Sequence, residues 1–148
     1  MINIKNHAQV ILKLGTVLSL QNTDNVIEIG VFLQETGADD LTTGGFWLYK
    51  FSDLQCYCSD KFIKVLEYDR KEVETSISFF NRTADIEQLQ KGYDLLAELI
   101  NESSEECFRN VLKYTTKNGI QITVNCIGSV CYKNGEPFLS VGTHSINK

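Results

Sequence analysis

The side chains that could carry chemistry in this sequence are five cysteines, two histidines and nineteen carboxylates. His7 and His144 are distant in the chain, and two histidines do not make a zinc site by themselves. The sequence has no paired-cysteine zinc spacing, no HExxH, no glycine-rich phosphate loop and no serine nucleophile elbow. We therefore predict no metal site, and nucleophilic or metal-assisted catalysis has no motif to support it.

Proton transfer between buried carboxylates is a catalytic chemistry that leaves no linear signature. In this chain the acidic residues fall mostly in polar runs, as in 101–106, or at expected helix caps. We therefore expect that the chain is not an enzyme, and we keep a small α+β enzyme only as a third hypothesis.

Length and charge limit the class of protein and its partners. A chain of 148 residues, 43% of them hydrophobic, can bury a core without metal or disulfide staples. The net charge of −5 leaves no basic surface for nucleic acid or anionic lipid. No apolar run approaches the roughly 20 residues of a membrane span, and no signal peptide is evident. We expect a cytoplasmic protein with free thiols and with neither nucleic-acid nor membrane partners.

The last third of the sequence predicts a three-stranded antiparallel meander from Cys107 to Ile146. Asn118-Gly119 and Asn134-Gly135 mark its turns, because both central residues of a type I′ turn need positive φ. From Ile120 to Tyr132 apolar residues occupy the even positions, and this period of two is typical of a strand. We expect the even face to cover a core and the neutral odd face to meet water or a second protein surface.

The segment from Asn3 to Leu20 is expected to form a helix with a wide apolar stripe. One hypothesis packs this helix on its own domain, and the other pairs it with a second copy of the chain or with the outer face of a sheet. For the second, a homodimer, the expected interface residues are Ile4, Ile11, Leu14 and Leu18. We divide the chain into this helix with its connection, residues 1–24, and a main domain, residues 25–148.

Shorter elements are expected after the first helix. A second helix should begin near residue 25 with Asp24 as its N-cap, and two short strands should cover 46–51 and 54–58. Ser59 is a suitable N-cap for a helix that continues to residue 66, because its hydroxyl can accept a free backbone N–H.

The longest internal helix is expected at about 83–101. Asp85 and Gln88 have capping-box spacing, and apolar residues recur every three or four positions from Ile86 to Ile100. With the meander and the two short strands, this order predicts an α+β fold, in which several helices cover a five-stranded antiparallel sheet.

The interior between sheet and helices follows from the even face of the central strand and the apolar stripe of the long helix. We expect it to be lined by Phe62, Leu66, Phe79, Leu89, Tyr93, Leu112, Tyr114, Ile122, Val124, Cys126 and Val141. A pocket, if the protein has one, should be bordered by these residues.

Residues 45–147 also resemble a known family in the order of their local motifs. The family's opening, Gly-x-Trp, a turn and an aromatic-x-Ser, corresponds to Gly45-Phe46-Trp47, Ser52-Asp53 and Tyr57-Cys58-Ser59. Its next helix and Gly-Tyr-x-x-x-Glu correspond to Phe62, Val65-Leu66, Tyr68 and Glu72, with Glu67 in place of glycine. Later matches are Asp85, Lys113, Asn118-Gly119 and Asn134-Gly135-Glu136-Pro137. This order resembles a PAS domain of the subgroup that ends in a PAC segment.

Three positions depart from the family pattern. Thr83 replaces a proline before the long helix, and the run Ile122-Thr123-Val124 lacks a common tryptophan. The ending Gly-x-x-Asp-Ile-Thr reads Gly142-Thr143-His144-Ser145-Ile146-Asn147.

PAS domains are sensory and dimerising modules that hold a small ligand or cofactor in a half-barrel closed by helices. The resemblance implies that residues 25–148 form a PAS-like sensor domain and that the interior residues named above are its ligand-binding candidates.

The resemblance also allows cofactor classes to be compared. A heme-binding member usually has a histidine on the long helix, and 83–101 contains none. A flavin photosensor of the light-oxygen-voltage kind carries Asn-Cys-Arg before that helix, whereas this chain has Asn81-Arg82-Thr83. Neither heme nor flavin is supported, and the cofactor is left unknown.

The leading functional hypothesis is a cytoplasmic PAS signalling module that binds a small ligand or a protein and transmits signals through dimerisation. Such a module could be the sensor segment of a histidine kinase or cyclase in a two-component system. The alternative is a ligand-free dimerisation or scaffold module, because the many aromatic residues near the expected cavity could fill it.

Overall fold

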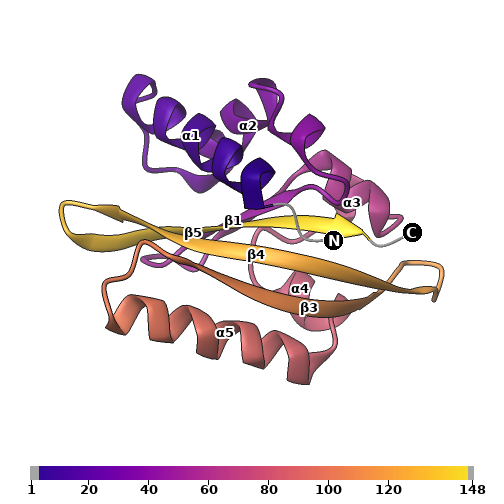
Figure 1. Ribbon diagram of the computed structural model, residues 1–148. Coiled ribbons are helices and arrows are strands. Elements are labelled where there is room, and N and C mark those ends of the chain that lie inside the picture. Colours follow the sequence, from indigo (N-terminus) through magenta and orange to yellow (C-terminus); the bar gives the residue numbers. More distant parts are fainter. Residues whose placement is uncertain (1–3, 147–148) are drawn as a thin grey trace.

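The computed structural model describes residues 4–146, which form one antiparallel sheet with helices on both faces (Figure 1). The predicted helix start at Asn3 and the final motif residue Asn147 lie outside the described residues. In chain order the elements are α1 (Ile4–Leu20), α2 (Val26–Glu35), η1 (Ala38–Leu41), β1 (Phe46–Lys50), β2 (Cys56–Cys58), α3 (Asp60–Val65), η2 (Arg70–Glu72), α4 (Ser78–Thr83), α5 (Ile86–Asn101), β3 (Cys107–Thr115), β4 (Gln121–Lys133) and β5 (Glu136–Ile146). The predicted α+β class and the five-stranded sheet are confirmed.

The strand order of the sheet is β2-β1-β5-β4-β3, with every neighbouring pair antiparallel. The predicted meander supplies β3, β4 and β5, and the first hairpin docks beside β5 through the register Leu48↔Val141. At the second turn Asn134 and Gly135 both have positive φ, as a type I′ turn requires. At the first turn only Gly119 does, because the connection is longer and closes through Thr116 N–H to the Ile120 carbonyl.

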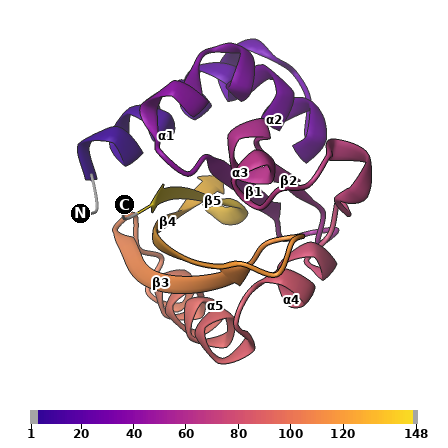
Figure 2. The ribbon, with the colours of Figure 1, turned by 90° about the vertical axis from the view of Figure 1, so that its right-hand side faces the viewer.

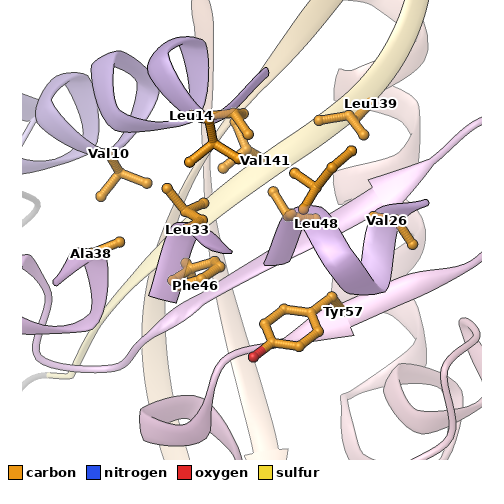
Figure 3. Close-up of a cluster of buried hydrophobic side chains, with 12 residues drawn as sticks. Val10, Leu14, Val26, Leu33, Ala38, Phe46, Leu48, Tyr57, Leu139 and Val141 are labelled. Atoms are coloured by element: carbon orange, nitrogen blue, oxygen red, sulfur yellow. The ribbon is translucent and has the colours of Figure 1, made fainter. Parts of the chain in front are cut away.

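Helices α1 and α2 cover one face of the sheet, which we call the outer face (Figures 1 and 2). The buried residues between these helices and the sheet form the outer cluster: Val10, Leu14, Val17, Val26, Ile29, Leu33, Ala38, Phe46, Leu48, Tyr57, Leu139 and Val141. Figure 3 shows Leu14 of α1 beside Val141 of β5 in this cluster. Since these side chains leave water together, α1 is held to the sheet mainly by apolar burial.

The opposite face, the inner face, is covered by α5 and α4 and closed at the β2 end by α3 (Figure 2). The inner cluster of buried residues is Cys56, Cys58, Phe62, Ile63, Leu66, Phe79, Phe80, Leu89, Leu112, Tyr114, Val124 and Cys126. Strand β3 alternates in burial, with Phe108, Leu112 and Tyr114 buried and the odd positions after Cys107 exposed. The sheet therefore has an apolar layer on each face.

Two helix boundaries differ from the sequence-based prediction. The N-cap of α2 is Asn25, whose side-chain oxygen accepts the N–H of Glu28, whereas Asp24 was expected. The helix expected at about 83–101 begins three residues later as α5, because Asp85 caps it through the N–H of Gln88 while Thr83 is the last residue of α4. Both caps supply an acceptor to an otherwise free N–H of the first turn.

Helix α1 packs on the sheet of its own chain. Leu14, one of the four residues expected at a dimer interface, is fully buried there in the outer cluster. Ile11 and Leu18 are half-buried against the same cluster, and Ile4 is 44% exposed. The reason is that the packed stripe of α1 runs through His7, Val10, Leu14 and Val17.

No helix within 4–146 has the length and apolar character needed to cross a membrane.

One polar contact fixes α1 on the sheet. The ring of His7 is buried, with Nδ1 2.8 Å from Oγ1 of Thr143 and Nε2 2.7 Å from Oγ of Ser129. Burial lowers the pKa of His7 to about 4, so the ring is neutral and can donate at one nitrogen and accept at the other. The neutral outer face that was expected to receive a helix therefore receives α1 of its own chain.

Candidate functional site

A small cavity of about 50 Å³ lies between α5 and the inner face of the sheet. Its wall is mostly aromatic and aliphatic and is made by Trp47, Tyr49, Cys56, Ile77, Phe80, Leu89, Gly92, Tyr93, Leu96, Phe108, Asn110, Leu112, Tyr114 and Cys126. A water occupies about 30 Å³ in the liquid, so this volume accepts only one or two waters or a molecule of a few non-hydrogen atoms. Ligand pockets for larger molecules usually have about 300–1,000 Å³.

Five of the predicted interior residues line this cavity: Leu89, Tyr93, Leu112, Tyr114 and Cys126. Five more belong to or pack against the inner cluster without lining the cavity: Phe62, Leu66, Phe79, Val124 and the half-buried Ile122. The prediction that Val141 borders the cavity was wrong, because this residue lies on the outer face, under α1 and α2. In β5 the apolar Leu139 and Val141 face the outer cluster, and no residue of this strand lines the cavity.

Sequence reasoning missed nine wall residues: Trp47, Tyr49, Cys56, Ile77, Phe80, Gly92, Leu96, Phe108 and Asn110. In β1, Trp47 and Tyr49 alternate with Phe46 and Leu48, so both faces of the strand are apolar and alternation cannot identify the inner one. Leu96 was on the predicted stripe of the long helix, but the interior list did not include it.

The hydroxyls of Tyr93 and Tyr114 are buried and have no hydrogen-bond partner within the described residues. Tyr93 stands on α5 and Tyr114 on β3, and both line the cavity. Burial raises the pKa of Tyr93 to about 12 and that of Tyr114 well above its usual value. Both phenols are therefore neutral at physiological pH.

A polar link joins α5 to β3 at the cavity wall. Asn110 Nδ2 donates to the Gln88 carbonyl at 3.0 Å, and the Lys113 N–H donates to Gln88 Oε1 at 2.6 Å. A Cβ on Gly92 would lie 2.9 Å from Asn110 Nδ2, so glycine on this helix leaves room for the amide. These contacts hold the first half of α5, while only Leu89 and Leu96 of the helix are fully buried.

His144 is buried deeper in the inner layer and does not line the cavity. Trp47 Nε1 donates to His144 Nε2 at 3.2 Å, which places the proton of the neutral ring on Nδ1. That Nδ1 has no partner among the described residues, and the ring packs edge-on against Phe62. Burial lowers the pKa of His144 to about 3, so this histidine is uncharged.

No charged side chain lines the cavity within the described residues. Its two thiols are protonated, because burial raises the pKa of Cys56 to about 12 and of Cys126 to about 12. The site therefore offers apolar contact and neutral hydrogen-bonding groups, and it offers no counter-charge to an ionic ligand.

A larger groove of about 480 Å³ lies between α2 and the segment 70–75. Arg70 is tied down there, because its guanidinium contacts Asp60, donates to the Cys58 carbonyl and stacks over Tyr57. Because Arg70 is already engaged by Asp60 and by the backbone, we regard the apolar cavity under α5 as the candidate functional site.

The fold is similar to those of known protein structures. No family model and no curated protein sequence gives a significant match. A sensory box histidine kinase/response regulator from Burkholderia thailandensis E264 has a similar structure, with TM-score 0.58 and 17% identity over 75% of this chain and 82% of that chain. A PAS domain from a two-component sensor histidine kinase matches with TM-score 0.54 and 13% identity over 78% of this chain and 97% of that chain. The chain has the PAS fold.

A light-oxygen-voltage domain that was studied with a flavin analogue has a similar fold, with TM-score 0.59. It is 15% identical over 78% of this chain and 85% of that chain. At such identities the likeness concerns the fold alone. The residues here do not fit a flavin, because the cavity is far too small for its three-ring system and Arg82 stands where the photosensor motif has cysteine.

Proposed function

We propose that this chain is a sensory signalling module whose PAS fold detects a small molecule in the cavity under α5. The observation that carries this proposal is an apolar cavity of about 50 Å³ between α5 and the inner face of the sheet, with no charged side chain in its wall within the described residues. The PAS fold of the sensor-kinase neighbours supports the same proposal.

The second candidate is a ligand-free dimerisation or scaffold module, which the small volume of the cavity favours. The inner layer is filled by packed rings, such as Phe62 against Phe80 and Tyr114. A close-packed interior of this kind stabilises a fold without any ligand.

Native mass spectrometry of freshly purified protein separates the two candidates and also reports the number of subunits. A retained small molecule, or a mass increase with a compound from a fragment library, is expected for the sensor. The cavity-filling variant Leu89→Phe should abolish that mass increase, while Leu12→Phe, on the exposed side of α1, should keep it. A protein that binds nothing at millimolar fragment concentrations would favour the scaffold.

We further propose that the protein acts as a cytoplasmic homodimer within a two-component or related signalling pathway and that it is not an enzyme. The one serine–histidine contact described, Ser129 with His7, is buried beneath α1, and its third member is the hydroxyl of Thr143. A serine nucleophile needs substrate access and a base that a third group orients, so this contact fits a structural role better. Sedimentation at tens of micromolar tests the dimer.

A further inference from the structure

The sheet has two edge strands, β2 and β3, and the chain itself covers them differently. At the β2 edge the Cys56 N–H donates to the Thr75 carbonyl, so a neighbouring segment pairs with this short strand. Strand β3 is longer and forms the edge of the sheet away from α1 and α2 (Figure 2). Its odd-numbered side chains after the first are exposed, and Val111 is 46% exposed.

The backbone contacts of Lys113 show which groups of β3 point away from the sheet. Its N–H donates to Gln88 Oε1 and its carbonyl accepts the Asp85 N–H, and both partners belong to the start of α5. In an antiparallel pair, the N–H and C=O of every second residue point away from the neighbouring strand. Arg109 and Val111 therefore also turn both groups outward. Within the described residues, no hydrogen bond joins these groups to another segment.

An edge strand with free N–H and C=O groups can pair with an extended segment of another chain. The side chains of β3 indicate which kind of segment fits. Arg109 and Lys113 flank Val111 on the exposed face, and neither cation forms an ion pair in the part of the chain that the structure describes. A second copy of β3 would bring the same cations together, and like charges across paired strands are destabilising, whereas acidic side chains would be attracted.

We propose that β3 is a docking edge for an extended acidic segment of a partner protein, which pairs antiparallel with the backbone of Arg109 and Val111. The segment places an acidic residue next to Arg109 and an apolar residue against Val111. A second acidic residue lies at its end, within reach of the long, flexible side chain of Lys113. Pairing stops there, because the start of α5 already occupies the backbone of Lys113. None of these three residues lines the cavity, so the docking edge does not depend on the proposed ligand.

Two peptides test the charge argument: acetyl-Thr-Glu-Thr-Val-Thr-Glu-Thr-amide and the same peptide with lysine in place of both glutamates. Titration into the full chain, followed by chemical shifts of backbone amides, should show that the acidic peptide binds about tenfold more tightly. Arg109→Glu should abolish this preference. Lys64→Glu is the matched control, because this exposed lysine belongs to α3, at the β2 end of the sheet, and it should keep the preference.

Hydrogen exchange tests the backbone pairing. The acidic peptide should slow exchange of the Arg109 and Val111 amides several-fold and leave those of Asn110 and Leu112 unchanged, because the latter already point to β4. N-methylation of the peptide's valine nitrogen should abolish binding, since this N–H faces the Val111 carbonyl. N-methylation of the preceding threonine nitrogen, which faces away from β3, should be tolerated.

Equal binding of the two peptides, or binding that leaves the Arg109 and Val111 amides unprotected, would overturn the docking edge. Slower exchange of these amides in the protein alone as its concentration rises would also overturn it, because the edge would then belong to a second copy. Failure of both peptides to bind at millimolar concentration would overturn it as well. None of these outcomes bears on the proposed sensor cavity, which small-molecule binding tests separately.

Discussion

Tyr93 and Tyr114 depart from the usual packing of a protein interior, because each has a buried hydroxyl without a hydrogen-bond partner within the described residues. An unsatisfied buried polar group costs about 1–3 kcal/mol, which is a large part of the total stability of a small domain. Residues that lower stability in this way are concentrated at functional sites, because selection for stability alone would replace them. The buried hydroxyl of Tyr114 is therefore a position at which a substitution can raise stability.

Tyr114→Phe should therefore leave the free energy of unfolding unchanged or raise it by about 1 kcal/mol, because the variant removes a hydroxyl that has no partner. Tyr132→Phe should lower it by about 1 kcal/mol, because that hydroxyl donates to the Ser104 carbonyl at 3.0 Å. Urea unfolding of the ligand-free protein measures both. A loss in Tyr114→Phe as large as that in Tyr132→Phe would mean that the Tyr114 hydroxyl has a partner in solution.

The two buried histidines should make stability fall on mild acidification. Burial lowers the pKa of His7 to about 4 and of His144 to about 3, while both are near 6.5 in the unfolded chain. Between pH 6.5 and about 4 the unfolded state binds more protons, so the stability present above pH 6.5 is lost as the pH falls through this window. Each histidine contributes a slope of about 1.4 kcal/mol per pH unit.

His7→Gln isolates one half of this effect, because glutamine can still bond to Thr143 or Ser129 but does not titrate. Urea unfolding at several pH values between 4.5 and 7 should give about half the parent slope. An unchanged slope in His7→Gln would show that His7 keeps its ordinary pKa in the folded protein.

At the scale of elements, α5 is held by apolar side chains that pack in two clusters and by polar contacts at Gln88 and at the Leu99 carbonyl. The helix contains Gly92 in its interior, a position where glycine costs about 1 kcal/mol relative to alanine. The close approach of Asn110 gives the glycine a structural reason, since no other residue leaves that space free.

Gly92→Ala and Gly15→Ala test this reason in a matched way, because both glycines stand in helix interiors. A Cβ added to Gly15 of α1 would meet no atom within 4 Å, so alanine there should stabilise the protein by about 0.5–1 kcal/mol. Alanine at Gly92 should gain nothing or destabilise, because it displaces the Asn110 amide from Gln88. Thermal unfolding compares the two, and equal stabilisation would contradict the packing account.

The elements of this fold were largely predictable, and the cavity wall was not. Alternation in β4 and the Asn118-Gly119 and Asn134-Gly135 turns are local signals, and they placed the meander correctly. The wall depends in part on which face of β1 turns inward, and this strand is apolar on both faces. Asn110 gave no signal because its role arises only from the approach of Gln88, from a different element.

At the scale of the whole molecule, one sheet separates two apolar layers, of which one packs α1 and α2 and the other borders the cavity. The outer cluster fixes α1 and α2, and its polar contact at His7 is fully paired. The inner cluster surrounds a cavity with unpartnered groups. Strands β1 and β5 contribute side chains to both layers. A change of packing in one layer can therefore alter the packing of the other through the backbone that they share.

The two faces of α1 should respond oppositely to the same substitution. Leu14→Asp places a carboxylate in the outer cluster, where the side chain is fully buried, and should destabilise the protein by at least about 4 kcal/mol. Leu12→Asp, at a side chain that is 72% exposed, should leave the free energy of unfolding nearly unchanged. Urea unfolding gives both values, and sedimentation of the same samples gives the oligomeric state.

The sedimentation result bears on the expected homodimer. If α1 pairs two copies, the contact must use the side that faces away from the sheet, where Ile4, Leu12 and Leu20 are exposed. Leu12→Asp should then convert a dimer into a stable monomer, whereas Leu14→Asp should act through loss of folding. A Leu14→Asp variant as stable as the parent would show that α1 does not pack on its own sheet in solution, and the pairing of α1 with a second copy would regain its support.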